Sequence, residues 1–250
     1  MRVQILHAQL LVLNQRFLQA SAFLNTLPAQ LQQTPFLKGV LGQIQLHQNE
    51  FNAALPNLEA AYQVNPSPQN ARLIALTKIR LSGHQQAVDF LIGHLDTQEK
   101  DLINILFVAD LLIDIDPNKA MAYYRRLLNI QPDNFMALNN LAYLLAESGV
   151  FEEAYALIEN ALKIQPDSVD VLDTAGAIAL KLDKNKQALN HLSKGYNLSG
   201  KEPSDELVVN YIEALFKNNQ TRLAERNIGR HQVSDPQQSA RLEQLKKRHL

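Results

Sequence analysis

The sequence contains no cysteine and no tryptophan, and only 6% of its 250 residues are aromatic. Without cysteine the chain forms neither a disulfide nor a thiolate metal site. The charges nearly cancel, with 24 Lys and Arg residues against 25 Asp and Glu residues, so no broad positive field attracts nucleic acid or an anionic membrane surface. We therefore expect neither nucleic-acid binding nor general binding to polyanions.

Long apolar runs are also missing. No stretch approaches the roughly 18 apolar residues that a transmembrane helix requires. The first residues, MRVQILHAQLLVLNQRF, carry one early positive charge, but Gln4, His7 and Gln9 interrupt the apolar run of a signal peptide. The sequence predicts no signal peptide and no direct insertion into a membrane. The absence of cysteine fits the cytoplasm and the periplasm equally, so the compartment stays open.

The residues present in abundance are Leu, Ala, Gln, Asn and Glu, which favour helices over strands. No alternating run bounded by turn dipeptides indicates a strand. The composition therefore predicts an all-α fold.

A series of alanines recurs along the chain with nearly constant spacing. The successive differences are 34, 33, 33, 34, 34 and 36 residues for Ala20, Ala54, Ala87, Ala120, Ala154, Ala188 and Ala224. Prolines follow the same register, since Pro132 and Pro166 are 34 residues apart. A period in this range is typical of helical-hairpin repeats. Small residues let the two helices of a hairpin approach closely, and stacked hairpins bury the apolar faces that one hairpin leaves open.

The pattern resembles the tetratricopeptide repeat family, whose unit of about 34 residues is a pair of antiparallel helices with the motif W-x2-L-G-x2-Y, then A-x3-F, A and P. The best copy spans residues 135–168, FMALNNLAYLLAESGVFEEAYALIENALKIQPDS. In it, Leu141 and Ala142 stand at the Leu-Gly pair, and Ala154, Ala161 and Pro166 complete the motif. The tryptophan position is always substituted.

The resemblance covers nearly the whole chain. It implies a single domain over 1–250, an α-α superhelix (solenoid) of about seven tetratricopeptide-like hairpins plus a C-terminal capping helix. The expected repeats are 1–34, 35–68, 69–100 (shortened at the turn near Gly83), 101–134, 135–168, 169–202 and 205–234, with the capping helix at 236–249. Asp116 and Asp235, each before a proline, predict helix N-caps, whereas Pro56 should kink its helix or displace the start.

Motifs for catalysis are weak. Gly195 to Glu202, GYNLSGKE, fits G-x-x-x-x-G-K, but Glu202 replaces the Ser or Thr that would bind magnesium, and the segment should end a helix rather than follow a strand. The seven histidines do not pair at three- or four-residue spacing, so no metal site is expected. We predict a protein that is not an enzyme and that has no cofactor.

In the tetratricopeptide family the first helix of each unit lines a concave groove that holds a peptide. Transferred to this sequence, the resemblance implies a groove formed by Leu102, Ile105, Met136, Asn139, Asn140, Tyr143, Glu147, Asp170, Asp173 and Lys181. Asn140 stands where many members contact a peptide backbone. The positions that carry a basic clamp in chaperone-binding members are Ile105, Asn139 and Asp173 here, so a chaperone tail is disfavoured.

The expected function is a non-enzymatic scaffold that binds a peptide or protein segment. ALNNLAYLLAESG and SVDVLDTAGAIALK also resemble the repeats of bacterial envelope and exopolysaccharide (PEP-CTERM-type) tetratricopeptide proteins, which implies a role in assembly there. The alternative is a structural, self-associating segment of a longer array. Residues 1–14 favour this alternative, because Val3, Leu6 and Leu10 enter the first helix with no polar cap before them, so a homo-oligomer through the N-terminal face is the second hypothesis.

Overall fold

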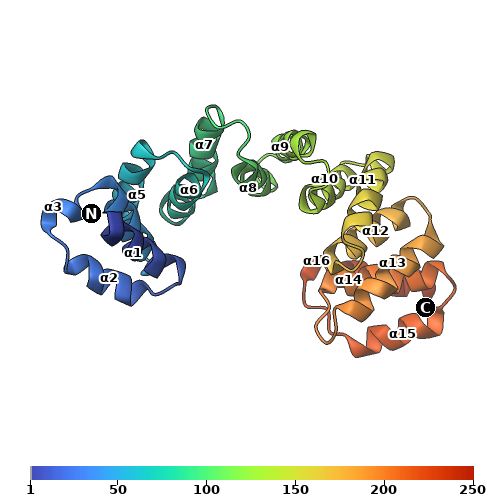
Figure 1. Cartoon of the computed structure of the whole chain (residues 1–250). Coiled ribbons are helices and arrows are strands. Elements are labelled where there is room, and N and C mark those ends of the chain that lie inside the picture. Colours follow the sequence, from blue (N-terminus) through green and yellow to red (C-terminus); the bar gives the residue numbers. More distant parts are fainter. Residues whose placement is uncertain (1) are drawn as a thin grey trace. The chain divides into compact units, whose positions relative to one another are not determined.

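The computed structural model describes residues 2–250, which form helices joined by short turns and contain no strand (Figure 1). The all-α prediction is confirmed. By their internal contacts the residues divide into two compact units, Met1–Tyr123 (unit 1) and Tyr124–Leu250 (unit 2). The division falls inside α9 (Pro117–Ile130). Each unit is described by itself, and the single continuous solenoid over 1–250 stays a prediction.

Unit 1 is built from consecutive hairpins. Its helices are α1 (Arg2–Leu13), α2 (Phe17–Asn25), α3 (Ala29–Gln32), α4 (Pro35–His47), α5 (Phe51–Val64), α6 (Pro68–Ser82), α7 (His84–Leu95) and α8 (Leu102–Leu112). Helix α4 packs on α5 and α6 on α7, and the first helices α4, α6 and α8 contact one another in turn. The short α3, which the repeat pattern did not predict, begins after Pro28 and places Leu31 in the core.

Unit 2 repeats the arrangement. After the end of α9 come α10 (Phe135–Glu147), α11 (Phe151–Ile164), α12 (Val169–Lys181), α13 (Asn185–Leu198), α14 (Asp205–Lys217), α15 (Thr221–Arg230) and α16 (Pro236–His249). The hairpins are α10 with α11, α12 with α13 and α14 with α15. The first helices form a row, because α10 contacts α12, α12 contacts α14, and α14 contacts α16. Helix α16 thus packs where the first helix of a further hairpin would pack.

The recurring alanines lie in the core. All seven are 0% exposed: Ala20, Ala54, Ala87, Ala120, Ala154, Ala188 and Ala224. Close approach is also enforced from the first helix of a hairpin, since a Cβ on Gly42 would lie 2.8 Å from Cγ of Leu58. A Cβ on Gly176 would overlap the side chain of Leu192. The 34-residue period is therefore a packing requirement where the two helices of a hairpin meet.

Turns and caps recur with the same period. The residue that closes the first helix of a hairpin has positive φ in six hairpins: Gln15 (58°), Asn49 (63°), Gly83 (91°), Gly149 (81°), Asp183 (53°) and Asn219 (60°). Gly83 alone joins α6 to α7, which confirms the shortened turn. The predicted N-caps are also present, because Asp116 accepts a hydrogen bond from the Lys119 amide (3.1 Å) and Asp235 accepts one from the Gln238 amide (2.8 Å).

Two further sequence features can be located. Helix α5 begins at Phe51 and continues through Pro56 to Val64, so the proline does not displace the start of the helix. The segment Gly195 to Glu202 begins in the last turn of α13 and continues into the turn after it. It is therefore preceded by a helix, whereas a phosphate-binding loop follows a strand. Within residues 2–250, no helix has both the length and the apolar character needed to cross a membrane.

Candidate functional site

The ten residues expected in the groove fall in both units. Leu102 and Ile105 lie on α8 in unit 1, and the other eight lie on α10 and α12 in unit 2. Ile105 is 0% exposed and belongs to the core of unit 1, so it does not line a surface. Leu102 is half-buried in the first turn of α8. The candidate site is therefore confined to unit 2.

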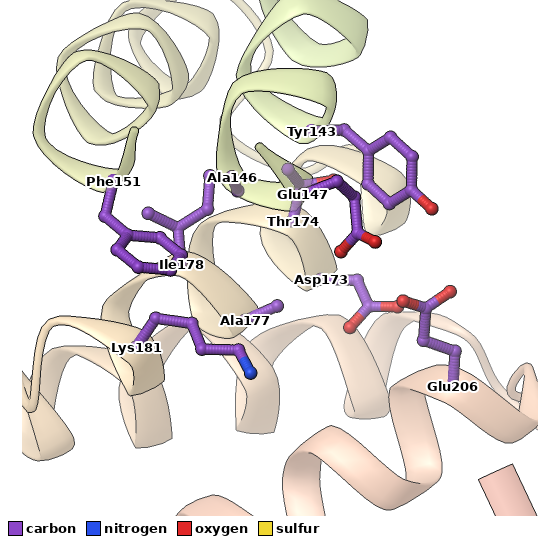
Figure 2. A pocket seen from close by; sticks show the side chains of 10 residues that line it. All are labelled: Tyr143, Ala146, Glu147, Phe151, Asp173, Thr174, Ala177, Ile178, Lys181 and Glu206. Atoms are coloured by element: carbon purple, nitrogen blue, oxygen red, sulfur yellow. The ribbon is translucent and has the colours of Figure 1, made fainter. Parts of the chain in front are cut away.

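A pocket of about 100 Å³ opens between the first helices of unit 2, and Figure 2 shows the side chains around it. Four of the expected residues line this pocket together: Tyr143 and Glu147 from α10, and Asp173 and Lys181 from α12. The remaining lining residues, which are not among those ten, are Ala146, Phe151, Thr174, Ala177, Ile178 and Glu206. We call this space the α10–α12 pocket.

A wider polar hollow of about 600 Å³ adjoins the α10–α12 pocket and shares Tyr143, Glu147, Ala177, Lys181 and Glu206 with it. Helices α14 and α16 supply most of its other residues, namely Asp205, Asn210, Glu213, Asp235, Gln237, Gln238 and Arg241. If the groove positions of the family had also been applied to α14, two of the residues around these spaces would have been selected, Glu206 and Glu213. Asp170 and Ala177 on α12 correspond to Glu206 and Glu213 on α14, because the two helices begin 36 residues apart, at Val169 and Asp205.

Asp173 lies at one end of a chain of polar contacts that joins three helices. The Asn210 side-chain amide donates a hydrogen bond to the Asp173 carboxylate (2.7 Å), and the Asn210 oxygen accepts one from the Arg241 guanidinium (2.7 Å). Arg241 also pairs with Glu213. Burial, together with the nearby charges of Glu206 and Asp170, raises the pKa of Asp173 to about 6, against the opposing effects of the Asn210 hydrogen bond and the Arg241 charge. Negative charge is thus unfavourable at this position.

The other expected residues differ in accessibility. Met136 and Tyr143 are 45% and 42% exposed, and Asp170 is exposed as well. Asn140 donates a hydrogen bond to the buried Tyr124 hydroxyl (3.1 Å) and accepts one from Asn139 (3.2 Å). Contact between Asn140 and a peptide backbone would compete with these bonds. The Asn139 side-chain oxygen, by contrast, has no hydrogen-bond partner among the described residues.

A second polar cluster lies inside unit 1. The His94 ring bonds the Tyr62 hydroxyl through Nδ1 (2.8 Å) and the Asp101 carboxylate through Nε2 (2.9 Å). Asn104 donates to Asp101 (2.6 Å) and to the Pro68 carbonyl (2.9 Å). His94, Asp101 and Asn104 are buried, so the cluster joins α5, α7 and α8 rather than facing a substrate.

Comparisons with known proteins agree with the fold. The family model of anaphase-promoting complex, cyclosome, subunit 3 matches residues 115–195. The type IV pilus assembly protein PilF of Pseudomonas aeruginosa is 27% identical over 106 residues, which is 42% of this chain and 41% of PilF. The match therefore spans less than half of that relative.

Two solved structures are similar over more of the chain. The C-terminal part of a TPR repeat-containing protein from Cytophaga hutchinsonii superposes with a TM-score of 0.73 at 12% identity, covering 95% of this chain and 99% of that one. A tetratricopeptide repeat protein from Parabacteroides merdae has a TM-score of 0.65 at 16% identity and covers 79% and 78%. The chain is thus a helical-hairpin repeat protein with the tetratricopeptide fold.

Proposed function

We propose that unit 2 is a scaffold that binds an extended segment of another protein along the row of α10, α12 and α14. The observation that carries the proposal is the α10–α12 pocket, to which α10 (Tyr143, Glu147), α12 (Asp173, Lys181) and α14 (Glu206) each contribute side chains. A row of equivalent helices offers equivalent positions at regular intervals, which suits a partner that is itself extended. Tetratricopeptide proteins are in general non-catalytic scaffolds, and this role follows that rule.

The surface of the row has the character of a peptide site. Met136 and Tyr143 are large side chains left about half exposed on α10. The Tyr143 ring adds contact area at little cost in conformational freedom, and the flexible Met136 side chain adapts to the shape of a partner. The Asn139 side-chain oxygen, one turn before Tyr143, is buried without a hydrogen-bond partner among the described residues, and rotation of this side chain toward the groove would let the oxygen accept a hydrogen bond from a backbone amide of the bound segment. A partner segment would therefore gain both apolar contact and a directional bond.

The name of PilF concerns pilus assembly, so we extend the proposal to a role in holding components during the assembly of a protein complex. The envelope or exopolysaccharide pathway suggested by the repeats remains a hypothesis about where that role is exercised.

The experiment is to pan a phage-displayed library of random short peptides on the full chain and to measure binding of a captured peptide by fluorescence anisotropy. The paired variant Asn139→Ala/Tyr143→Ala should weaken binding at least tenfold while helicity by circular dichroism is unchanged. A matched control is Arg222→Ala/Glu225→Ala, two exposed residues of α15 outside the pocket and the hollow. Equal affinity in wild type and the paired variant would rule out this groove as the binding site.

A second candidate function, self-association through α1, is favoured by a separate observation in unit 1. Four apolar side chains on α1 are spaced by 3, 4 and 3 residues and are more than half exposed: Val3 (78%), Leu6 (55%), Leu10 (56%) and Leu13 (67%). This spacing forms one stripe on a helix, and three of the four residues, Val3, Leu6 and Leu10, line a shallow hollow of about 380 Å³. A second copy of the chain would cover this stripe with its own.

A further inference from the structure

The charges around the α10–α12 pocket are unequal. Three carboxylates line it, those of Glu147, Asp173 and Glu206, against one ammonium, that of Lys181. In Figure 2 the carboxylates of Asp173 and Glu206 lie close together, and Glu147 points toward them from α10. None of the three forms an ion pair within residues 2–250. The pocket therefore has a negative end, with three carboxylates that form no ion pair within residues 2–250.

Two other carboxylates of the adjoining hollow are already engaged. Asp205 accepts hydrogen bonds from the backbone amides of Ser234 and Asp235, both at 2.7 Å, and Glu213 pairs with Arg241. The carboxylates at the end of the pocket near Asp173 thus differ in forming no ion pair among the described residues, although the Arg241 charge acts on Asp173 from beyond ion-pair distance. The Gln238 oxygen in the wall of the hollow is likewise buried without a hydrogen-bond partner there. The carboxylates without an ion pair indicate a ligand that donates hydrogen bonds.

The rest of the pocket is apolar. Phe151, Ala146, Ala177 and Ile178 line it together with the Tyr143 ring. A ligand that fits both parts needs an apolar stem and a cationic end, as in the side chains of lysine and arginine. The Tyr143 ring offers such a cation a favourable face. A bare metal ion does not match, because no three acidic or histidine side chains of the described chain are arranged to coordinate one.

We infer that the segment bound by unit 2 inserts a lysine or arginine side chain into the α10–α12 pocket, with its stem against Phe151 and Ile178 and its charge between Asp173, Glu206 and Glu147. This inference rests on the proposed function and specifies the partner chemistry of the same groove. Asp173 is the central recognition residue, because it is the carboxylate held in place by a neighbouring side chain, Asn210. Glu147 and Glu206 are exposed and close over the cation from either side.

The test uses the peptides captured on the full chain from the random library. Captured peptides should share a lysine or arginine at one fixed position, and replacing it by norleucine, which keeps the apolar stem, should weaken binding at least tenfold. The variant Asp173→Asn/Glu206→Gln should weaken binding of the unmodified peptide equally and should bind the norleucine peptide as the wild type does. The asparagine side chain keeps an oxygen that accepts the hydrogen bond from Asn210, so the fold is retained, and circular dichroism checks this.

A matched control has the same change of charge on an outer surface. Glu152→Gln/Glu225→Gln removes two exposed carboxylates from α11 and α15 and should leave the affinity unchanged. Equal weakening in this control would assign the effect to net charge and overturn the inference. Peptides that bind the groove, as shown by loss of binding in Asn139→Ala/Tyr143→Ala, but that carry no basic residue would overturn the inference and leave the proposed function standing. A library that yields no binder would overturn both.

Discussion

The side-chain amide of Asn210 on α14 donates a 2.7 Å hydrogen bond to the carboxylate of Asp173 on α12. This bond joins two neighbouring hairpins at the candidate site. Asn210 also accepts a hydrogen bond from Arg241, so the C-terminal helix α16 is linked through one side chain to the pocket. The groove and helix α16 are therefore coupled, and changes at Asp173 should affect both binding and stability.

The first prediction concerns pH. Since the pKa of Asp173 is raised to about 6 in the folded chain, from an ordinary value of 3.8, its protonated form stabilises the fold. That contribution is complete below about pH 4 and is lost as the pH rises through about 6. The neutral amide in Asp173→Asn mimics the protonated form, so the variant should be more stable than wild type at pH 7.5, by up to about 2 kcal/mol, and equal near pH 4.

Urea unfolding followed by circular dichroism at both pH values measures this difference. The exposed Glu225→Gln on α15, whose charge is not among those that act on Asp173, serves as control and should show no comparable difference between the two pH values. A wild-type advantage at pH 7.5 would contradict the assigned environment of Asp173.

The second prediction concerns the close contact inside a hairpin. Gly176→Ala places a methyl group against Leu192 of α13 and should destabilise the chain by about 1–3 kcal/mol, because the helices must separate. Gly229→Ala on α15 meets no atom within 4 Å and should be neutral or stabilising by about 0.5–1 kcal/mol. Urea unfolding compares the two variants. If Gly176→Ala proved as harmless as Gly229→Ala, the tight hairpin packing would be wrong.

The third prediction concerns the buried cluster of unit 1. Asp101→Ala removes the N-cap of α8 and leaves His94 Nε2 without its partner, which should cost roughly 2–4 kcal/mol. Asp96→Ala, an exposed change just after α7, should stay within about 0.5 kcal/mol of wild type. Thermal unfolding of the full chain distinguishes them. Similar unfolding temperatures for both variants would show that the cluster does not stabilise unit 1.

The fourth prediction concerns self-association. If α1 pairs with a second copy, sedimentation velocity over a range of concentrations should show a dimer that Leu6→Gln/Leu10→Gln converts to a monomer. Leu18→Gln, on α2 and 82% exposed, is the matched control and should leave the dimer intact. A wild-type chain that stays monomeric at high concentration would exclude this second function.

The sequence predicted most of the fold because the repeat imposes the same helix packing on every hairpin. The register of Ala20 to Ala224 and the caps at Asp116 and Asp235 follow directly from how close helices must approach and where they begin. The short α3 was missed, since a single turn after Pro28 has no periodic signal.

The site was predicted only in part. The repeat pattern gives the position of a residue on its helix but not the exposure of its side chain. The sequence therefore could not distinguish the buried Ile105 from the exposed Met136. Glu206 and Glu213 on α14 stand at repeat positions that could have been transferred from α12, whereas the side chains of α16 were not selected because their role depends on contacts between separate hairpins. The hydrogen bonds from Asp173 through Asn210 to Arg241 join α12, α14 and α16. No short-range pattern in the sequence predicts contacts between residues this far apart along the chain.

We propose that a partner segment lies across α10, α12 and α14. The most direct measurement is photo-crosslinking of a captured peptide to the chain with a benzophenone side chain in place of Tyr143, followed by mass spectrometry of the products. The same group in place of Glu152, exposed on α11, is the control. A peptide that lies across these three helices should crosslink from position 143 and not from position 152. Efficient crosslinking from position 152 with none from position 143 would exclude this groove as the binding site.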